Sequence, residues 1–202
     1  AGAPSPRRHV GLDRVSGRAM DAIYVGGQQG WHLPLCGSGG GGQVYRDPLA
    51  IGTYFPTDFE LYDMTGERVN LSQLVSVRKT VIAFFVVAVP ASVLELKKLQ
   101  DFAAEQVPQL QVFNVHANTI QADLTGGGPN RAVEDSIRTV ALARKEHGLR
   151  NPTFVAPNDT MSPTGLSNRL GVRGVPTIFV LGADGKVQNI FIGPHNWKPG
   201  DL

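Results

Sequence analysis

The chain has 202 residues, of which 42% are hydrophobic and 18% charged, and its formal net charge at pH 7 is +2. This length suits one domain with an extension, and the apolar content is enough for a core. The nearly neutral charge gives no electrostatic footprint for nucleic acid, so we expect no nucleic-acid partner. Cys36 is the single cysteine, which excludes an internal disulfide. No stretch approaches the roughly 18 to 20 apolar residues that a membrane-spanning helix needs.

Residues 1–52 show no sustained helical or strand periodicity and contain the glycine-rich run that starts at Cys36 and ends at Gly42. Glycine loses the most backbone entropy on folding, so such a run rarely forms regular structure. We predict an irregular N-terminal arm over 1–52 and one domain over 53–202. A phosphate-binding loop is disfavoured, because no Lys-Ser/Thr pair follows the glycines.

The strongest local signal is the apolar run Val81–Val89, which is rich in β-branched and aromatic residues. Its length and composition predict a central strand covered on both faces. Pro90 is favoured at the first position of a helix. An apolar stripe at helical spacing then continues to Val107, before Pro108. We therefore predict a strand that leads directly into a helix.

The other predicted elements form an alternating α/β pattern around this unit. Phe59–Asp63 and Val69–Leu71 alternate around the turn at Thr65-Gly66, which predicts two short strands. The remaining predictions are a helical turn from Ser72, a strand over 110–115, a helix over 130–147, a strand over 154–156, a helix over 162–170 that ends at Gly171, and a hairpin of two strands around Ala183–Lys186.

Three segments carry a resemblance to the thioredoxin-like superfamily, closest to its TlpA/ResA type, which is related to AhpC/TSA peroxiredoxin domains. Phe59–Leu74 is similar to the entry motif F-x-L-x-D-x-x-G-x-x-V-x-L-S-x-L. Phe84–Leu96 lies without a gap over the strand, W-C-x-x-C and helix of that group, and Gly171–Leu181 is similar to its Y-G-V-x-G-V-P-T-T-F-L-I-D segment. Gly193–Trp197 resembles the G-P-x-x-W that precedes the last helix, so we expect the N-terminal arm or another protein to cover part of the sheet if the chain ends at Leu202.

The resemblance implies a thioredoxin-like α/β fold, in which a central mixed sheet is flanked by helices. It also implies a cis Val175–Pro176 bond facing the start of the helix. The two cysteine positions of the family are occupied by Val89 and Ser92, and Ala88 replaces its tryptophan. We therefore expect no catalytic residue here. The expected partner-binding surface consists of Val89, Pro90, Ala91, Ser92, Val175 and Pro176.

These observations favour a redox-inactive structural or interaction subunit that binds other protein subunits in a larger, membrane-bound assembly. The resemblance and the AGAPSP start, which suits a mature N-terminus after cleavage, indicate an extracytoplasmic location with peripheral contact to membrane proteins. A thiol oxidoreductase or peroxidase-like enzyme that uses Cys36 or a partner's thiols is the first alternative. A metallochaperone-type assembly factor is the second, although the five histidines show no paired spacing. We expect no cofactor and no resident metal.

Overall fold

The computed structural model describes residues 49–75, 78–119, 128–158 and 164–202. The prediction of an irregular arm falls on residues 1–52, most of which lie outside the described residues. The elements in chain order are β1 (Glu60–Tyr62), β2 (Arg68–Asn70), α1 (Leu71–Leu74), β3 (Thr80–Phe85), α2 (Pro90–Gln106), β4 (Gln111–Thr119), α4 (Gly128–His147), β5 (Thr153–Asn158), α5 (Leu166–Leu170), β6 (Thr177–Leu181) and β7 (Val187–Ile192).

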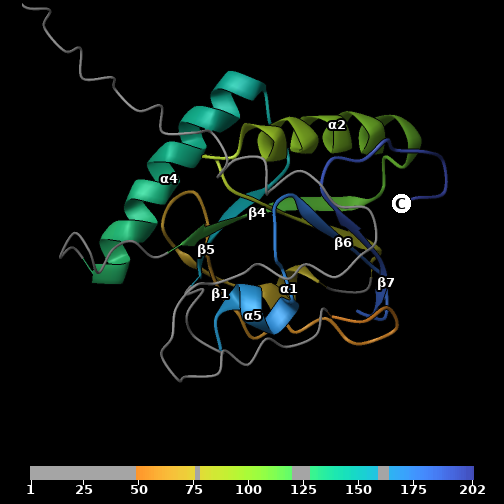
Figure 1. The fold of residues 1–202 in the computed structure, drawn as a ribbon, viewed down its shortest axis with the longest axis horizontal. Coiled ribbons are helices and arrows are strands. Elements are labelled where there is room, and N and C mark those ends of the chain that lie inside the picture. Colours follow the sequence, from red (N-terminus) through yellow and green to blue (C-terminus); the bar gives the residue numbers. More distant parts are fainter. Residues whose placement is uncertain (1–48, 76–77, 120–127, 159–163) are drawn as a thin grey trace, which may run out of the picture. The chain divides into compact units, whose positions relative to one another are not determined.

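The strands of the described part form one mixed sheet (Figure 1). Their order in it is β2-β1-β5-β4-β3-β6-β7. At its centre, β3 pairs in parallel with β4 and antiparallel with β6. All six residues of β3 are buried, as expected for a strand with neighbours on both sides and layers on both faces. The predicted thioredoxin-like mixed sheet flanked by helices is confirmed.

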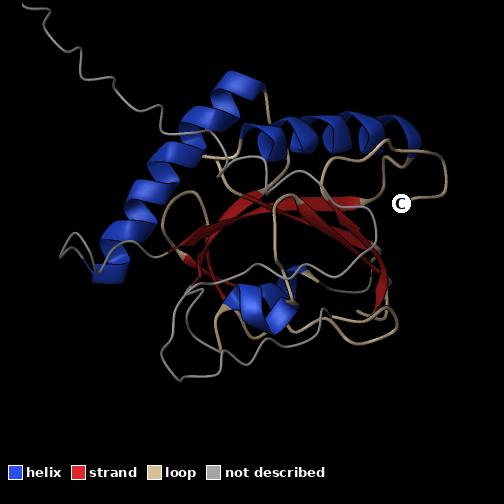
Figure 2. Ribbon diagram, in the orientation of Figure 1, coloured by secondary structure: helices blue, strands red, loops and turns tan. Residues whose placement is uncertain are grey.

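Two helical layers cover the sheet, with α2 and α4 on one face and α1 and α5 on the other (Figure 2). Successive side chains of a strand point to opposite faces of the sheet, so the side chains of β3 alternate between the two layers. Val81, Ala83 and Phe85 join the cluster beneath α2, whereas Ile82 and Phe84 join the cluster on the opposite face. The predicted stripe of α2 is also confirmed, because Val93, Leu96, Leu99 and Ala103 are all buried in the first cluster.

The structure changes several predicted boundaries: the strand predicted over 154–156 spans Thr153–Asn158, and the helix predicted over 130–147 begins at Gly128. Three other elements differ more. The strand predicted over 81–89 ends at Phe85, because the chain turns there and the Val89 N–H donates to the Val86 carbonyl at 2.9 Å. The helix predicted over 162–170 begins at Leu166, although residues 159–163 lie outside the described part. The strand predicted over 110–115 extends to Thr119 because it pairs with β5 along that length.

The last ten residues of the chain fold back along α2. Trp197 packs against the cluster beneath α2, and Leu202 is part of that cluster with only 8% of its surface exposed. The Gly193 N–H donates to the Pro176 carbonyl at 2.8 Å and fixes the start of this segment. Part of the sheet face that we expected another segment or protein to cover is therefore covered by residues 193–202.

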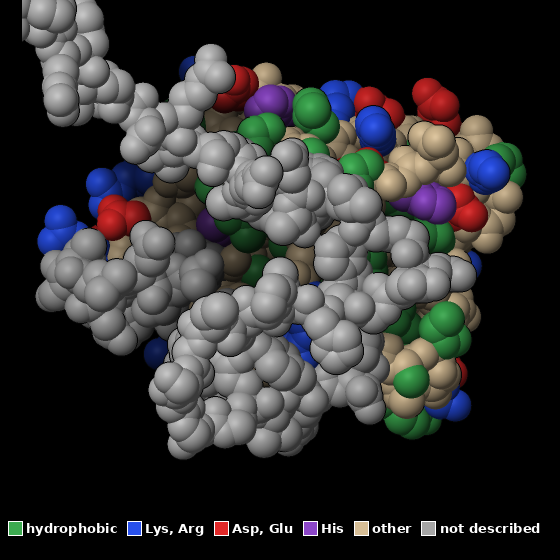
Figure 3. All heavy atoms as spheres, in the orientation of Figure 1, with side chains coloured by type: hydrophobic (Ala, Val, Ile, Leu, Met, Phe, Trp, Pro, Cys, Tyr) green, Lys and Arg blue, Asp and Glu red, His purple; other side chains and the backbone are tan. Residues whose placement is uncertain are grey.

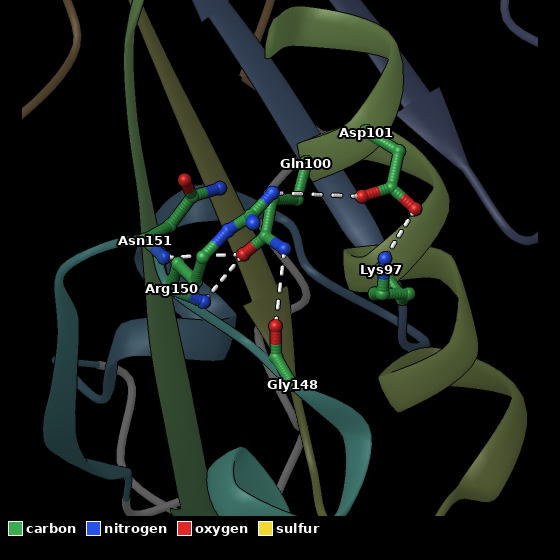
Figure 4. A network of polar contacts seen from close by, with 6 residues as sticks. All are labelled: Lys97, Gln100, Asp101, Gly148, Arg150 and Asn151. Atoms are coloured by element: carbon green, nitrogen blue, oxygen red, sulfur yellow. Dashed lines mark hydrogen bonds and ion pairs between the residues drawn. The ribbon is translucent and has the colours of Figure 1, made fainter.

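A buried glutamine joins α2 to the end of α4 (Figure 4). Gln100 is 4% exposed, and its amide nitrogen donates to the Gly148 carbonyl at 3.2 Å. Its amide oxygen accepts the backbone N–H groups of Arg150 and Asn151. On the outer side, Asp101 pairs with Lys97. The glutamine thus satisfies three backbone groups where α4 ends and the chain turns into β5.

Candidate functional site

The candidate site lies at the end of the sheet where the central strand β3 stops and α2 begins. We call this end of the sheet the site edge. Residues 86–89 form the turn between the two elements, and Pro90 is the first residue of the helix, as predicted. Val89 is the N-cap residue, but its side chain makes no capping hydrogen bond. Val89 is half-buried and Pro90 is exposed, so the start of the helix presents apolar side chains at its outer surface.

Ser92 lies beneath this turn and not on the surface. Its side chain is fully buried, and its hydroxyl oxygen lies 2.9 Å from the Val86 carbonyl oxygen and 2.7 Å from that of Val89. The same oxygen accepts the Val86 N–H at 3.3 Å. The hydroxyl is therefore occupied by the backbone of the turn. It stabilises the shape of the proposed surface, but an external substrate or partner does not reach it.

Val175 and Pro176 also lie at the site edge. Phe84 of β3 pairs with Thr177 of β6, so the residues that follow β3 and precede β6 are neighbours in register. The Val175–Pro176 peptide bond is cis, as the resemblance implied. Val175 is half-buried and Pro176 is buried, so Val175 supplies the accessible part of this pair. The structure thus brings the predicted residues to the site edge, with Ser92 and Pro176 inside it.

A second buried polar residue of α2 is Glu95, which was not among the site residues predicted from the sequence. Glu95 is 1% exposed, and its carboxylate accepts the indole N–H of Trp197 at 2.8 Å. The second oxygen lies 3.7 Å from the Lys98 ammonium. A glutamate on the buried stripe, one turn after Ser92, is the sequence signal that could have identified it. Its contacts hold residues 193–202 against the helix.

The C-terminal segment contains a histidine–aspartate pair. The His195 ring nitrogen Nε2 lies 3.0 Å from a carboxylate oxygen of Asp201, and this hydrogen bond lowers the pKa of Asp201. The His195 ring also packs on Phe191 and Trp197. The same carboxylate oxygen accepts the Lys198 N–H at 2.7 Å. These contacts close residues 195–201 into a compact loop, and no serine or cysteine is among them.

A buried histidine lies beneath the start of α2. His116 of β4 pairs in register with Phe85, the last residue of β3, and the two rings are 5.2 Å apart. Only 4% of His116 is exposed, and its Nδ1 atom has no hydrogen-bond partner among the described residues. Burial in these surroundings lowers the pKa of His116 to about 4, so the ring is neutral at pH 7.

The remaining predictions fall largely outside the described part. Cys36, the candidate reactive thiol, lies in residues 1–48 and has no described position. Among the described residues, no three His, Cys, Asp or Glu side chains are grouped as a metal site. Within the same ranges, no helix combines the length and the apolar character needed to cross a bilayer.

No model of a known protein family matches this chain. No curated protein matches it either. Among solved structures, a hypothetical protein from Sinorhizobium meliloti 1021 is 20% identical with a TM-score of 0.55, covering 77% of this chain and 76% of its own. The thioredoxin domain of a thiol-disulfide oxidoreductase from Bacteroides vulgatus is 14% identical with a TM-score of 0.51, over 72% and 90%. A thiol peroxidase from Chromobacterium violaceum is 21% identical with a TM-score of 0.51, over 73% and 78%.

At these identities the likeness concerns the fold, and it agrees with the strand order and the two helical layers described above. The structural likeness and the motif resemblance both indicate a thioredoxin-like fold. The motifs concerned are Phe84–Leu96 and Gly171–Leu181. The chain therefore has a thioredoxin-like fold. Val89 and Ser92 stand at the two positions that the motif resemblance aligns with cysteines.

Proposed function

We propose that this protein is a redox-inactive thioredoxin-like subunit that acts by binding other proteins. The observation that carries the proposal is the chemistry at the start of α2. A thiol oxidoreductase needs a thiolate near a helix N-terminus and a second thiol to resolve the mixed disulfide. Val89 supplies no nucleophile, and the Ser92 hydroxyl is buried and bound to the backbone of Val86 and Val89.

The proposed binding surface consists of the accessible residues at the site edge, namely Val89, Pro90, Ala91 and Val175, supported from within by Ser92 and Pro176. It is apolar where redox-active relatives would carry reactive groups, which suits a lasting contact better than turnover. We place the protein outside the cytoplasm, docked in a larger membrane-bound assembly. The motif resemblance supports this location.

An insulin-disulfide reduction assay with dithiothreitol tests the redox part of the proposal. We expect the protein to leave the rate of dithiothreitol alone unchanged, and Cys36→Ser to have no effect. The matched positive control is the double variant Val89→Cys and Ser92→Cys, which restores both thiols at the helix start and should accelerate the reaction. Peroxide consumption is measured on the same samples.

Acceleration by the unmodified protein that disappears in Cys36→Ser would overturn the proposal in favour of a thiol enzyme. Tight, stoichiometric copper binding in equilibrium dialysis would overturn it in favour of a metallochaperone. For the binding part, we expect the tagged protein to purify from detergent-solubilised membranes of its source at a fixed ratio with other subunits. Recovery as a monomer from every fraction would contradict this.

A further inference from the structure

A groove of about 260 Å³ lies between the start of α2 and the C-terminal half of α4. The α2 side contributes Val87, Pro90 and Val93 to its lining, and the α4 side contributes Thr139, Leu142, Ala143, Glu146 and His147. In Figure 3, hydrophobic side chains reach the surface over the layer formed by these two helices. Its volume is below the range of about 300–1,000 Å³ that is typical of small-molecule sites, so the groove suits a single inserted side chain.

The wall formed by α4 exposes apolar surface. Leu142 is 70% exposed although it lies beside Ala143, which is buried. A leucine with this exposure gains from being covered, because burial of apolar surface is favourable. Leu94 on α2 is 53% exposed but does not line the groove. Leu94 therefore provides an internal control, because its substitution changes an exposed leucine that lies outside the groove.

The charge at the end of the groove indicates which partner fits. Glu146 is exposed and is the next-to-last residue of α4, where the carbonyl end of the helix disfavours a carboxylate. It forms no ion pair with any other residue in the described ranges. A cation placed here would be attracted both by the carboxylate and by the helix end.

Leu142 and Glu146 are four residues apart, so they lie on one face of α4 with a rise of about 6 Å between them. In an extended peptide, residues i and i+2 point to the same side and are about 6.6 Å apart. The two spacings match. An extended chain can therefore place one side chain against Leu142 and the next on the same side against Glu146.

We propose that this groove binds an extended segment of a partner protein with the pattern apolar-x-basic. A large apolar side chain inserts between Pro90 and Leu142, and a lysine or arginine two residues away pairs with Glu146. This inference rests on the proposed function, because it assumes that the protein acts by binding other proteins. The groove, however, lies on the α4 side of the α2 start and does not require Val175 or Pro176.

The test is selection of a phage-displayed library of random nine-residue peptides on the full chain, followed by fluorescence anisotropy with the most enriched peptide. We expect enriched peptides to share the apolar-x-Lys/Arg pattern. Leu142→Arg and Glu146→Arg should each weaken binding at least tenfold, and Leu94→Arg should leave it unchanged. Replacing the basic residue of the peptide by glutamate should restore binding to Glu146→Arg. Circular dichroism of each variant verifies the fold.

Absence of enriched peptides, enrichment of another pattern, or equal affinity for wild type and Leu142→Arg would overturn the inference. Analytical ultracentrifugation provides a further test, because a dimer that Leu142→Arg dissociates would assign the groove to a second copy of this chain. A positive insulin-reduction assay would overturn the proposed function while leaving the peptide result intact. The two failures are therefore distinguishable.

Discussion

The start and the middle of α2 use buried polar side chains in different ways. At the start, the Ser92 hydroxyl bonds only to residues three and six positions away in the chain. In the middle, Gln100 bonds to residues about 50 positions away, and Glu95 bonds to Trp197 at a separation of 102. The contacts of the start are local, whereas those of the middle join distant segments.

This difference has a consequence for function. The long-range contacts that position α4 and the C-terminal segment do not involve Val89 or Ser92. The start of the helix can therefore present apolar side chains while the contacts of the middle hold the fold. We expect substitutions in the middle to cost more stability than substitutions at the start, and the following predictions test this ranking.

The largest effect is expected for Gln100→Met, which keeps the length of the side chain but removes its amide. The Gly148 carbonyl and the N–H groups of Arg150 and Asn151 would each lose a partner. Leaving such groups unsatisfied should lower the free energy of unfolding by about 4 kcal/mol. Urea denaturation followed by circular dichroism measures it.

The matched control for this variant is Gln106→Met, at the exposed end of the same helix. We expect it to change the stability by less than about 0.5 kcal/mol, as is usual for surface substitutions. A similar loss for both variants would mean that the amide contacts of Gln100 do not hold the end of α4.

The second effect concerns pH and the interior beneath the start of α2. The folded protein holds the pKa of His116 at about 4, below the ordinary 6.5 of an exposed histidine. The unfolded chain therefore takes up the proton first as the pH falls. The contribution of the neutral His116 ring to stability is complete above pH 6.5 and is lost progressively down to about pH 4. The loss over this window should be about 3 kcal/mol.

Urea denaturation at pH 7.0, 5.5 and 4.5 measures this dependence. His116→Leu has a similar volume and no titrating ring, so its stability should vary less over the same range. The control Gln106→Met, at the exposed end of α2, changes no titrating group and should keep the slope of the wild type. An equal slope for wild type and His116→Leu would mean that another group dominates the acid sensitivity.

The sequence predicted those features of this region that depend on local pattern. The apolar stripe of α2, the proline at its first position and the turn at Gly171 all follow from residues within one or two turns. The end of β3 was missed because the apolar run continues through the turn, and a uniform run contains no sign of where the strand stops. The cis bond before Pro176 was implied by the motif.

The buried polar contacts could not be predicted in the same way. Gln100 and Glu95 lie on the buried face of α2 by their spacing, but their partners are distant in sequence. Only the folded chain shows that Trp197 reaches Glu95 or that the end of α4 reaches Gln100. The groove beside Leu142 depends on the same placement of α4, so it too has no local signature.

The third effect is expected for Trp197→Phe, which removes the indole donor from the buried Glu95 carboxylate. The packing of an aromatic ring is largely kept, so the loss of about 2 kcal/mol in the free energy of unfolding reports the unsatisfied oxygen. Glu95→Gln is the matched control, because its amide oxygen still accepts the indole N–H. A loss for Glu95→Gln as large as that for Trp197→Phe would show that charge, and not this hydrogen bond, matters.

The smallest effect is expected at the start of the helix. Ser92→Ala removes the hydroxyl contacts to the backbone of Val86 and Val89. Because these contacts are local and the turn keeps its own Val89 N–H to Val86 carbonyl bond, the loss should be about 1 kcal/mol. Urea denaturation of Ser92→Ala beside Gln100→Met compares the two halves of α2 directly. A larger loss of unfolding free energy for Ser92→Ala than for Gln100→Met would contradict the ranking. It would mean that the Ser92 hydroxyl stabilises the whole fold and not only the local turn.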